Sequence, residues 1–383
     1  MKQLTKLWNH QHNKRNRTML TPLTAAMTFD VFPPNPPNDG IFFVDHSQKG
    51  RSGHLGHALV EYAPGQIIAF YPNCSDANKG HTGDGWMEYK RSVDGGRTWS
   101  EPTPLDYSKR VYDESGQARS VMCEKAICTR EGDILLFNLE CANIAEKNFT
   151  WQPLAVPTCL RSSDKGITWD NAQPVGDEPG RIWDVVYRDG VIYALELCND
   201  SSIKWYGNLP EHHYSLYVSE DQGRSFVRRS VLPFEITQRG YGALTFLPDG
   251  RLIAYVYNQM DEKHLDCVIS RDDGKTWGAS GKSFFAKQIR NPQIAMFKGG
   301  YVLHGRSGNK GEDEMRGNFV LYCSQDGIRW DEGQYLQMRT AGAGAYSNNL
   351  LVHSPGAQSE RLLIQASHAY EQNQTNIHHW WLS

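Results

Sequence analysis

The chain has 383 residues, of which 39% are hydrophobic and 11% aromatic, and it contains 35 glycines. Its formal net charge of −3 provides no attraction toward nucleic acid or an anionic membrane, so we expect neither as a partner. No apolar run approaches the roughly 18 residues of a membrane-spanning helix. The composition therefore predicts a turn-rich globular protein with a large core.

The first 40 residues are predicted to form an N-terminal extension that ends in a stiff connector. Their main apolar stretch, residues 19–27, is interrupted by Pro22 and does not predict a signal peptide. The proline-rich run at residues 33–37 favours an extended conformation. We expect one folded domain at residues 41–383 and a cytoplasmic location, with other locations left open.

An eight-residue pattern recurs along the rest of the chain. It has the form Ser-x-Asp-x-Gly-x-Thr-Trp and matches fully at residues 92–99, 162–169 and 270–277. Residues 219–226 end in Ser-Phe instead, and residues 324–330 are one position shorter. Successive copies begin about 50 to 70 residues apart, a period that is typical of one supersecondary unit copied along the chain.

Each copy of the pattern has the chemistry of a stabilised β-turn. Ser and Asp can accept hydrogen bonds from the turn backbone, Gly provides a positive φ, and the aromatic residue can pack beneath the turn. Between the copies, short apolar runs such as 58–62 and 66–70 flank turn residues, which predicts antiparallel hairpins. The last unit, residues 350–353, 362–366 and 376–382, has no copy of the pattern.

The repeated pattern resembles the Asp box of the sialidase-type β-propellers. In that family the box joins the third and fourth strands of a blade and lies away from the active site. The resemblance implies an all-β, six-bladed β-propeller with five boxed blades and one blade without a box. We expect the strand at residues 41–44 to complete the last blade and no helical segment to dominate; a seven-bladed ring that uses residues 1–40 is the alternative.

The inner strands of a propeller converge on one pocket, and the residues predicted at their rims are polar, aromatic and cationic. They are His54, His57 and His81; Arg119, Glu124 and Lys125; Arg181, Asp184 and Glu196; Tyr241 and Tyr257; Asn291, Gln293, His304, Arg306 and Arg316; and Tyr346 and Asn348. Such a set suits a sugar that carries a carboxylate.

The resemblance to sialidases extends to part of their site, which uses three Arg, an Asp acid/base, and a Tyr nucleophile activated by a Glu. Residues 344–348 resemble the segment that carries this Tyr, which implies that role for Tyr346, and Arg316 resembles the last Arg. Elsewhere the sequence departs from the family. His81 stands at the Asp position and Tyr241 at the Glu position, and residues 53–57 replace the expected Arg-Ile-Pro.

These departures argue against ordinary sialidase activity, because a Tyr without its Glu has a pKa near 10 and is a poor nucleophile. His, Tyr and Arg instead suit β-elimination of a uronic acid and resemble the sites of propeller polysaccharide lyases. The predicted roles are these: His81 or His57 as base, Tyr241 or Tyr257 as acid, Arg316 or Arg306 as carboxylate binder, with His54, Arg119 and Arg181 as further substrate-binding residues.

The predicted function is therefore cleavage of an oligosaccharide or polysaccharide at an acidic sugar, with elimination favoured over hydrolysis. One alternative is a sialidase-like hydrolase whose carboxylates are displaced to Asp84, Asp184, Glu124 or Glu196. Another is a propeller that binds sugar or protein without catalysis. The eight cysteines are irregularly spaced, and the histidine pairs 54/57, 212/213 and 378/379 are interpreted as ordinary residues. We expect no cofactor and no catalytic metal.

Overall fold

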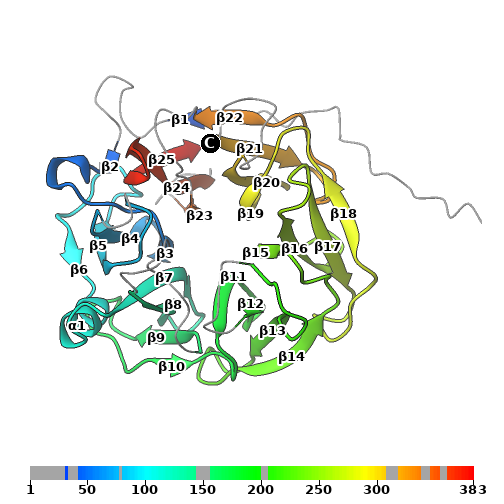
Figure 1. Cartoon of the computed structure of the whole chain (residues 1–383), viewed down its shortest axis with the longest axis horizontal. Helices are drawn as coiled ribbons and strands as arrows, with labels where there is room; N and C mark the ends of the chain where they lie inside the picture. The colour runs from blue at the N-terminus through cyan, green and yellow to red at the C-terminus, as the bar shows by residue number, and fades with distance from the viewer. Residues whose placement is uncertain are drawn as a thin grey trace, which may run out of the picture.

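The computed structural model describes residues 31–32, 42–76, 80–143, 156–199, 206–307, 318–337, 346–353 and 360–383. These residues form six antiparallel sheets arranged in a ring (Figure 1). Five sheets have four strands each, and the last has five. The predicted all-β, six-bladed propeller is confirmed, and the seven-bladed alternative is wrong. In the described part of the chain, no helix combines the length and the apolar character needed to cross a membrane.

The six blades follow one another in chain order. They are β3 (Ala58–Ala63), β4 (Gln66–Cys74), β5 (Gly85–Ser92) and β6 (Thr103–Pro104); β7 (Arg119–Cys128), β8 (Ile134–Ala142), β9 (Thr158–Ser162) and β10 (Gln173–Pro174); β11 (Gly180–Arg188), β12 (Val191–Cys198), β13 (His213–Ser219) and β14 (Val227–Leu232); β15 (Arg239–Phe246), β16 (Leu252–Asn258), β17 (His264–Ser270) and β18 (Gly281–Phe284); β19 (Arg290–Phe297), β20 (Gly300–Arg306), β21 (Phe319–Ser324) and β22 (Gln334–Gln337); and β23 (Ser347–His353), β24 (Glu360–Glu371) and β25 (Gln374–Leu382). The first strand of each blade contacts the first strands of both neighbouring blades, so these six strands surround the axis.

The last blade is completed by strands from the N-terminal part of the chain. β2 (Phe42–Val44) pairs with β25, as predicted for residues 41–44. β1 (Val31–Phe32) also pairs with β25, so the sheet includes residues that precede the predicted domain start at residue 41. The remainder of residues 1–41 lies outside the described residues. Closure therefore joins residues 31–32 and 42–44 with the C-terminal strands in one sheet.

One α-helix, α1 (Asp106–Glu114), was not expected from the sequence. It lies between the first and second blades, where Ser108 Oγ accepts a hydrogen bond from the Met87 amide at 2.9 Å and donates to the Val121 carbonyl at 2.8 Å. Only Ser108 and Tyr112 of the helix are buried. The helix has only nine residues and is mostly polar, so it offers too few apolar positions for its period to be recognised in the sequence.

The five repeated turns have the predicted structure. In residues 162–169, Ser162 Oγ accepts a hydrogen bond from the Gly166 amide at 2.7 Å, and Gly166 has a φ of 78°. Asp164 Oδ1 accepts from the amides of Ile167 and Thr168 at 3.0 and 2.8 Å. Each turn joins the third and fourth strands of its blade, as expected. Because the strands alternate in direction, all five turns lie at the face opposite to the starts of the inner strands.

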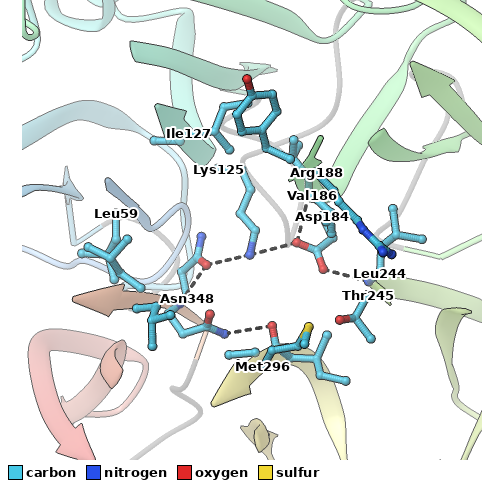
Figure 2. Close-up of a pocket in the computed structure, with 18 of the residues that line it drawn as sticks. Leu59, Lys125, Ile127, Asp184, Val186, Arg188, Leu244, Thr245, Met296 and Asn348 are labelled. Carbon is cyan, nitrogen blue, oxygen red and sulfur yellow. Dashed lines mark hydrogen bonds and ion pairs between the residues drawn. The ribbon is translucent and has the colours of Figure 1, made fainter. Parts of the chain in front are cut away.

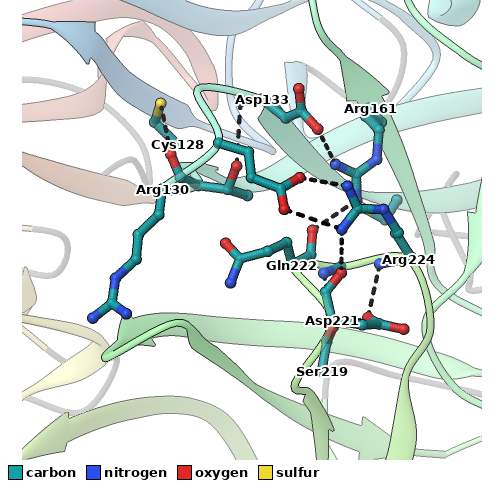
Figure 3. A network of polar contacts seen from close by, with 12 residues as sticks. Cys128, Arg130, Asp133, Arg161, Ser219, Asp221, Gln222 and Arg224 are labelled. Carbon is teal, nitrogen blue, oxygen red and sulfur yellow. Dashed lines mark hydrogen bonds and ion pairs between the residues drawn. The ribbon is translucent and has the colours of Figure 1, made fainter.

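The repeated turns also fasten the blades together. A side chain of the preceding blade donates a hydrogen bond to a carbonyl of each turn: Arg361 to Gly95, Arg91 to Gly166, Arg161 to Gln222, Ser230 to Gly274 and Ser283 to Ile328. Figure 3 shows this contact between the second and third blades, where Arg161 also pairs with Asp133 and Arg224 pairs with Glu131. We call this end of the molecule the turn face.

Candidate active site

Toward the opposite face, four inner strands carry an irregularity, which lies near the first residues of three strands and at the middle of β7. The register shifts between Cys123 and Lys125, Ile182 and Asp184, Gly240 and Ala243, and Arg290 and Gln293. β-Bulges of this kind re-aim side chains. The bulged residues Glu124, Trp183, Tyr241 and Asn291 line one small central cavity of about 20 Å³, together with Tyr346 and His57. We call this end the site face.

Two of the bulged residues have strained backbones. Tyr241 has a φ of 50° and Asn291 a φ of 54°, both in the left-handed region. A bulky aromatic residue rarely adopts this conformation, which costs about 1–3 kcal/mol and is concentrated at functional sites. In this structure the strain directs Tyr241 toward the propeller axis.

The hydroxyls of Tyr241 and Tyr346 form the centre of the site. Their oxygens are 3.2 Å apart, and both side chains are buried. Arg290 donates from Nε and Nη2 to the Tyr241 oxygen at 3.3 and 3.1 Å, and either tyrosine hydroxyl can donate to the other. Burial and the neighbouring Tyr241 raise the pKa of Tyr346 well above its ordinary value, against the effect of Arg181. The Tyr346 phenol is therefore protonated at neutral pH and can act as a proton donor.

Two buried arginines face each other beside the tyrosines. Arg290 and Arg306 are cross-strand partners in β19 and β20, and they are only 5% and 3% exposed. Like charges at such positions destabilise a sheet. Among the described residues no acidic side chain pairs with Arg306, its buried Nε has no hydrogen-bond partner, and burial together with Arg290 lowers its pKa. The pair therefore forms a positive site that an anion would stabilise.

A third cation, Arg181, also lies beside Tyr346, but it already has a carboxylate partner. Its guanidinium lies 2.9 Å from Glu124, 4.0 Å from the centre of the Trp183 ring and 5.6 Å from the Tyr346 ring. Burial raises the pKa of Glu124 despite this contact. Arg181 thus packs one wall of the site around Tyr346.

Two histidines form the opposite wall. The rings of His54 and His81 are 4.3 Å apart, and His54 lies 5.1 Å from the Tyr346 ring. Burial and His81 lower the pKa of His54 well below 6.5, while burial, Arg306 and Arg290 lower that of His81 to about 4. Both imidazoles are neutral at neutral pH and are available to accept a proton.

The structure thus brings together five of the predicted site residues, namely His54, His81, Arg181, Tyr241 and Tyr346, and places Arg306 beside them. His57 also lines the central cavity, whereas Tyr257 and Arg119 do not. His57 accepts a hydrogen bond from Gln365 at 3.2 Å, and burial lowers its pKa to about 3. Tyr257 lies behind Tyr241, with ring centres 5.5 Å apart, and donates its hydroxyl to Glu262. Arg119 is exposed and pairs with Glu140. Arg316 lies outside the described residues.

Sequence reasoning missed Arg290 and Trp183. An arginine occupies the first or second position of four inner strands, at residues 119, 181, 239 and 290. That recurrence could have identified Arg290 as a candidate. However, Arg239 pairs with Asp266 and Arg119 with Glu140, so recurrence alone does not select the two arginines that reach the site.

Four residues predicted at the rim instead close the axis beneath the site. Lys125 Nζ lies 2.9 Å from Asp184 Oδ1 and 2.7 Å from the side-chain oxygens of both Gln293 and Asn348. We call these four residues the axial cluster. Figure 2 shows Lys125, Asp184 and Asn348 among the residues that line a pocket of about 720 Å³, most of whose lining side chains are apolar. The pocket lies between the ends of the inner strands, so the axial cluster separates it from the site.

The four carboxylates predicted for the hydrolase alternative also lie in different parts of the molecule. Glu124 borders the central cavity, whereas Asp184 belongs to the axial cluster. Asp84 accepts hydrogen bonds from Ser75 and Tyr112 near α1. Glu196 is fully buried within the third blade. Of the four, Glu124 alone lines the cavity.

Comparison with solved structures supports the fold. The chain is similar to a protein of unknown function from Dyadobacter fermentans, with 16% identity, a TM-score of 0.65, and 88% of this chain and 95% of that chain covered. It is also similar to a Hadza microbial sialidase, with 14% identity, a TM-score of 0.63, and 88% and 67% covered. A third similar structure is an α-L-arabinanase from Penicillium chrysogenum complexed with arabinobiose, with 14% identity, a TM-score of 0.51, and 94% and 98% covered. No family model and no curated protein matches the sequence. The chain therefore has the sialidase-like propeller fold.

Proposed function

We propose that this protein is a carbohydrate-active enzyme that binds a sugar carboxylate and cleaves the adjacent glycosidic linkage by β-elimination. The observation that carries the proposal is the buried pair Arg290 and Arg306, which lies beside a protonated Tyr346 and the neutral His81. Similarity to a sialidase and to an arabinanase with bound arabinobiose supports a sugar as the substrate.

The carboxylate would bind to Arg306 and Arg290, because guanidinium groups match a carboxylate with paired, charge-assisted hydrogen bonds. Binding would also relieve the repulsion between the two cations. Neutralising the carboxylate makes the proton on the neighbouring sugar carbon more acidic. The anion site thus prepares the substrate for proton removal.

The reaction then needs one base and one acid. His81 accepts the proton from the carbon next to the carboxylate, and that electron pair forms a carbon–carbon double bond. The bond from the next carbon to the glycosidic oxygen breaks, and Tyr346 donates its proton to the leaving oxygen. No water is consumed, and the products are an unsaturated uronate and a free hydroxyl. Tyr241, held by Arg290, positions the Tyr346 hydroxyl.

A second candidate is hydrolysis with Tyr346 as nucleophile. Three arginines lie near Tyr346, which favours this candidate because sialidases use three arginines. They are Arg181, Arg290 and Arg306. The raised pKa of Tyr346 opposes it, since a nucleophilic tyrosine must lose its proton.

The test is digestion of a panel of uronic-acid glycans, monitored by the ultraviolet absorbance of an unsaturated uronate, with a fluorogenic sialoside assayed in parallel. We expect new absorbance that is lost in His81→Ala and retained in His353→Ala. His353 is the matched control, because its side chain is 54% exposed and pairs with Glu61 at the turn face. Sialoside cleavage without new absorbance would replace elimination by hydrolysis. Sugar binding without either reaction would contradict both catalytic candidates.

A further inference from the structure

A second cluster of reactive side chains lies within the third blade, behind the wall that carries Arg181. The ligand-type atoms of Glu178, Cys198 and His213 all lie within 4.8 Å of one another. Cys198 and His213 are direct cross-strand partners in β12 and β13, so their side chains share one face of the sheet. Glu178 comes from the segment just before β11. Three separate segments thus bring a thiol, an imidazole and a carboxylate together.

The orientation of His213 suits a metal ligand. Its Nδ1 lies 2.9 Å from the carbonyl oxygen of Glu211, and because that oxygen can only accept, Nδ1 carries the proton. Its Nε2 is buried without a hydrogen-bond partner and lies 3.5 Å from Glu178 Oε1. A backbone carbonyl that fixes Nδ1 while Nε2 points at acidic ligands is the usual support of a metal-bound histidine.

Glu196 places a fourth, acidic side chain beside these three residues. It is 0% exposed, and its side-chain hydrogen-bond contact is with Cys198, one of the three clustered residues. It lies two residues before Cys198 on the same face of β12, next to the thiol. A Cβ at Gly176 or Gly180 would come within 2.8 or 2.5 Å of its oxygens, so two glycines leave room for this carboxylate. Buried carboxyl groups in proteins are commonly paired with a cation or coordinate a metal ion.

We propose that Glu178, Cys198 and His213 bind a divalent transition-metal ion of the zinc type, with Glu196 neutralising its charge from the buried side. Zinc favours sulfur, imidazole and carboxylate ligands in a small tetrahedral shell. Arg228, which pairs with Glu178, would hold that carboxylate in place as an outer partner. Gly180 pairs with Cys198 and precedes Arg181, so the ion would tie the start of β11 to β12 and β13. This site is separate from the proposed elimination chemistry.

The experiment uses the full chain, stripped with a chelator and titrated with Co²⁺. A cobalt–thiolate bond gives a sulfur-to-metal charge-transfer band, so we expect this band to saturate at one Co²⁺ per chain and to disappear when Zn²⁺ is added. Cys198→Ser should abolish the band. Cys159→Ser should keep it, and it is a matched control because Cys159 and Cys198 are both free and 3% exposed.

A second variant guards against misfolding of Cys198→Ser. His213→Gln should retain the fold by circular dichroism and bind Co²⁺ at least about tenfold more weakly. The proposal is overturned if the folded wild type shows no thiolate band, if the band persists in Cys198→Ser, or if His213→Gln binds as tightly as the wild type. Because the readout is metal binding, it does not depend on the proposed elimination activity.

Discussion

The site face and the turn face of the propeller are built from the same strands but satisfy their polar groups differently. At the turn face, Asp94 accepts hydrogen bonds from the amides of Arg97 and Thr98 at 3.0 and 2.9 Å, and the other turns repeat this arrangement. At the site face, Arg290 and Arg306 lie opposite each other in a buried position, and Tyr241 has a strained backbone. One face has complementary partners, and the other concentrates like charges and strain.

The difference indicates that stability and function are separated along the propeller axis. The axial cluster lies between the two faces, and it pairs its only cation, Lys125, with Asp184. Substitutions at the site face should therefore reduce activity and leave stability unchanged or higher. Substitutions at the turn face or in the axial cluster should reduce stability and leave activity unchanged.

Tyr346→Phe should have the largest effect. Loss of a general acid lowers kcat by about 10²–10⁴-fold, while the fold loses only one weak hydrogen bond. The measurements are the initial rate of glycan cleavage and the free energy of unfolding in urea. Tyr322→Phe is the control, because its buried hydroxyl bonds only to the backbone of Lys287. It should lower stability and leave kcat unchanged; equal rate losses in both variants would contradict the separation of the faces.

Lys125→Met should be the most destabilising single change in the axial cluster. It leaves the buried carboxylate of Asp184 without its cation, which costs about 3–5 kcal/mol of unfolding free energy. Chemical denaturation measures the loss. Adding Asp184→Asn to the variant should recover part of it, because the uncompensated charge is removed. A double variant less stable than Lys125→Met would show that the carboxylate has another role.

Arg306→Met tests the repulsive pair directly. Loss of a charged hydrogen bond to the substrate should lower kcat/KM by about 10–100-fold. Removing one of two buried like charges should raise the free energy of unfolding by about 1 kcal/mol or more. Arg119→Met is the matched control, because it removes an exposed ion pair with Glu140 and should change stability by less than about 1 kcal/mol. A destabilised Arg306→Met would mean that this arginine supports the fold.

The smallest expected effect is the pH dependence of the stability contributed by Asp94 at the turn face. Against slight burial, hydrogen bonds from Thr98, Ser92 and Arg97 lower the pKa of Asp94 to about 2. The unfolded chain binds its proton near pH 4, so this stabilisation is present above that pH and is lost as the pH falls toward 2. Asp94→Asn should be less stable than the wild type by about 1 kcal/mol at pH 7. The difference in free energy of unfolding between the wild type and Asp94→Asn, measured by urea denaturation, should be smaller at pH 2 and 3 than at pH 7. A difference that does not change with pH would contradict the interpretation.

The sequence by itself predicted the blades and their turns. Each turn makes its hydrogen bonds within eight residues, as Asp164 does with Ile167 and Thr168, so the whole unit can be read from a short pattern. The inner strands followed from turn residues between apolar runs, and the closing strand, predicted at residues 41–44, followed from the need to close the ring. The sequence also selected His54, His81, Arg181, Tyr241, Arg306 and Tyr346 as candidate site residues.

Only the tertiary structure decided which of the predicted residues meet. Tyr241 and Tyr346 are 105 positions apart in sequence, and their contact depends on a bulge in β15 that no local pattern revealed. The same bulges separate Glu124, which reaches the cavity, from Lys125, which turns into the axial cluster. A one-residue shift moves a strand side chain to the other face of its sheet. Each blade can thus be recognised from a short stretch of this sequence. The site instead depends on where bulges fall in inner strands that are distant from one another in the chain.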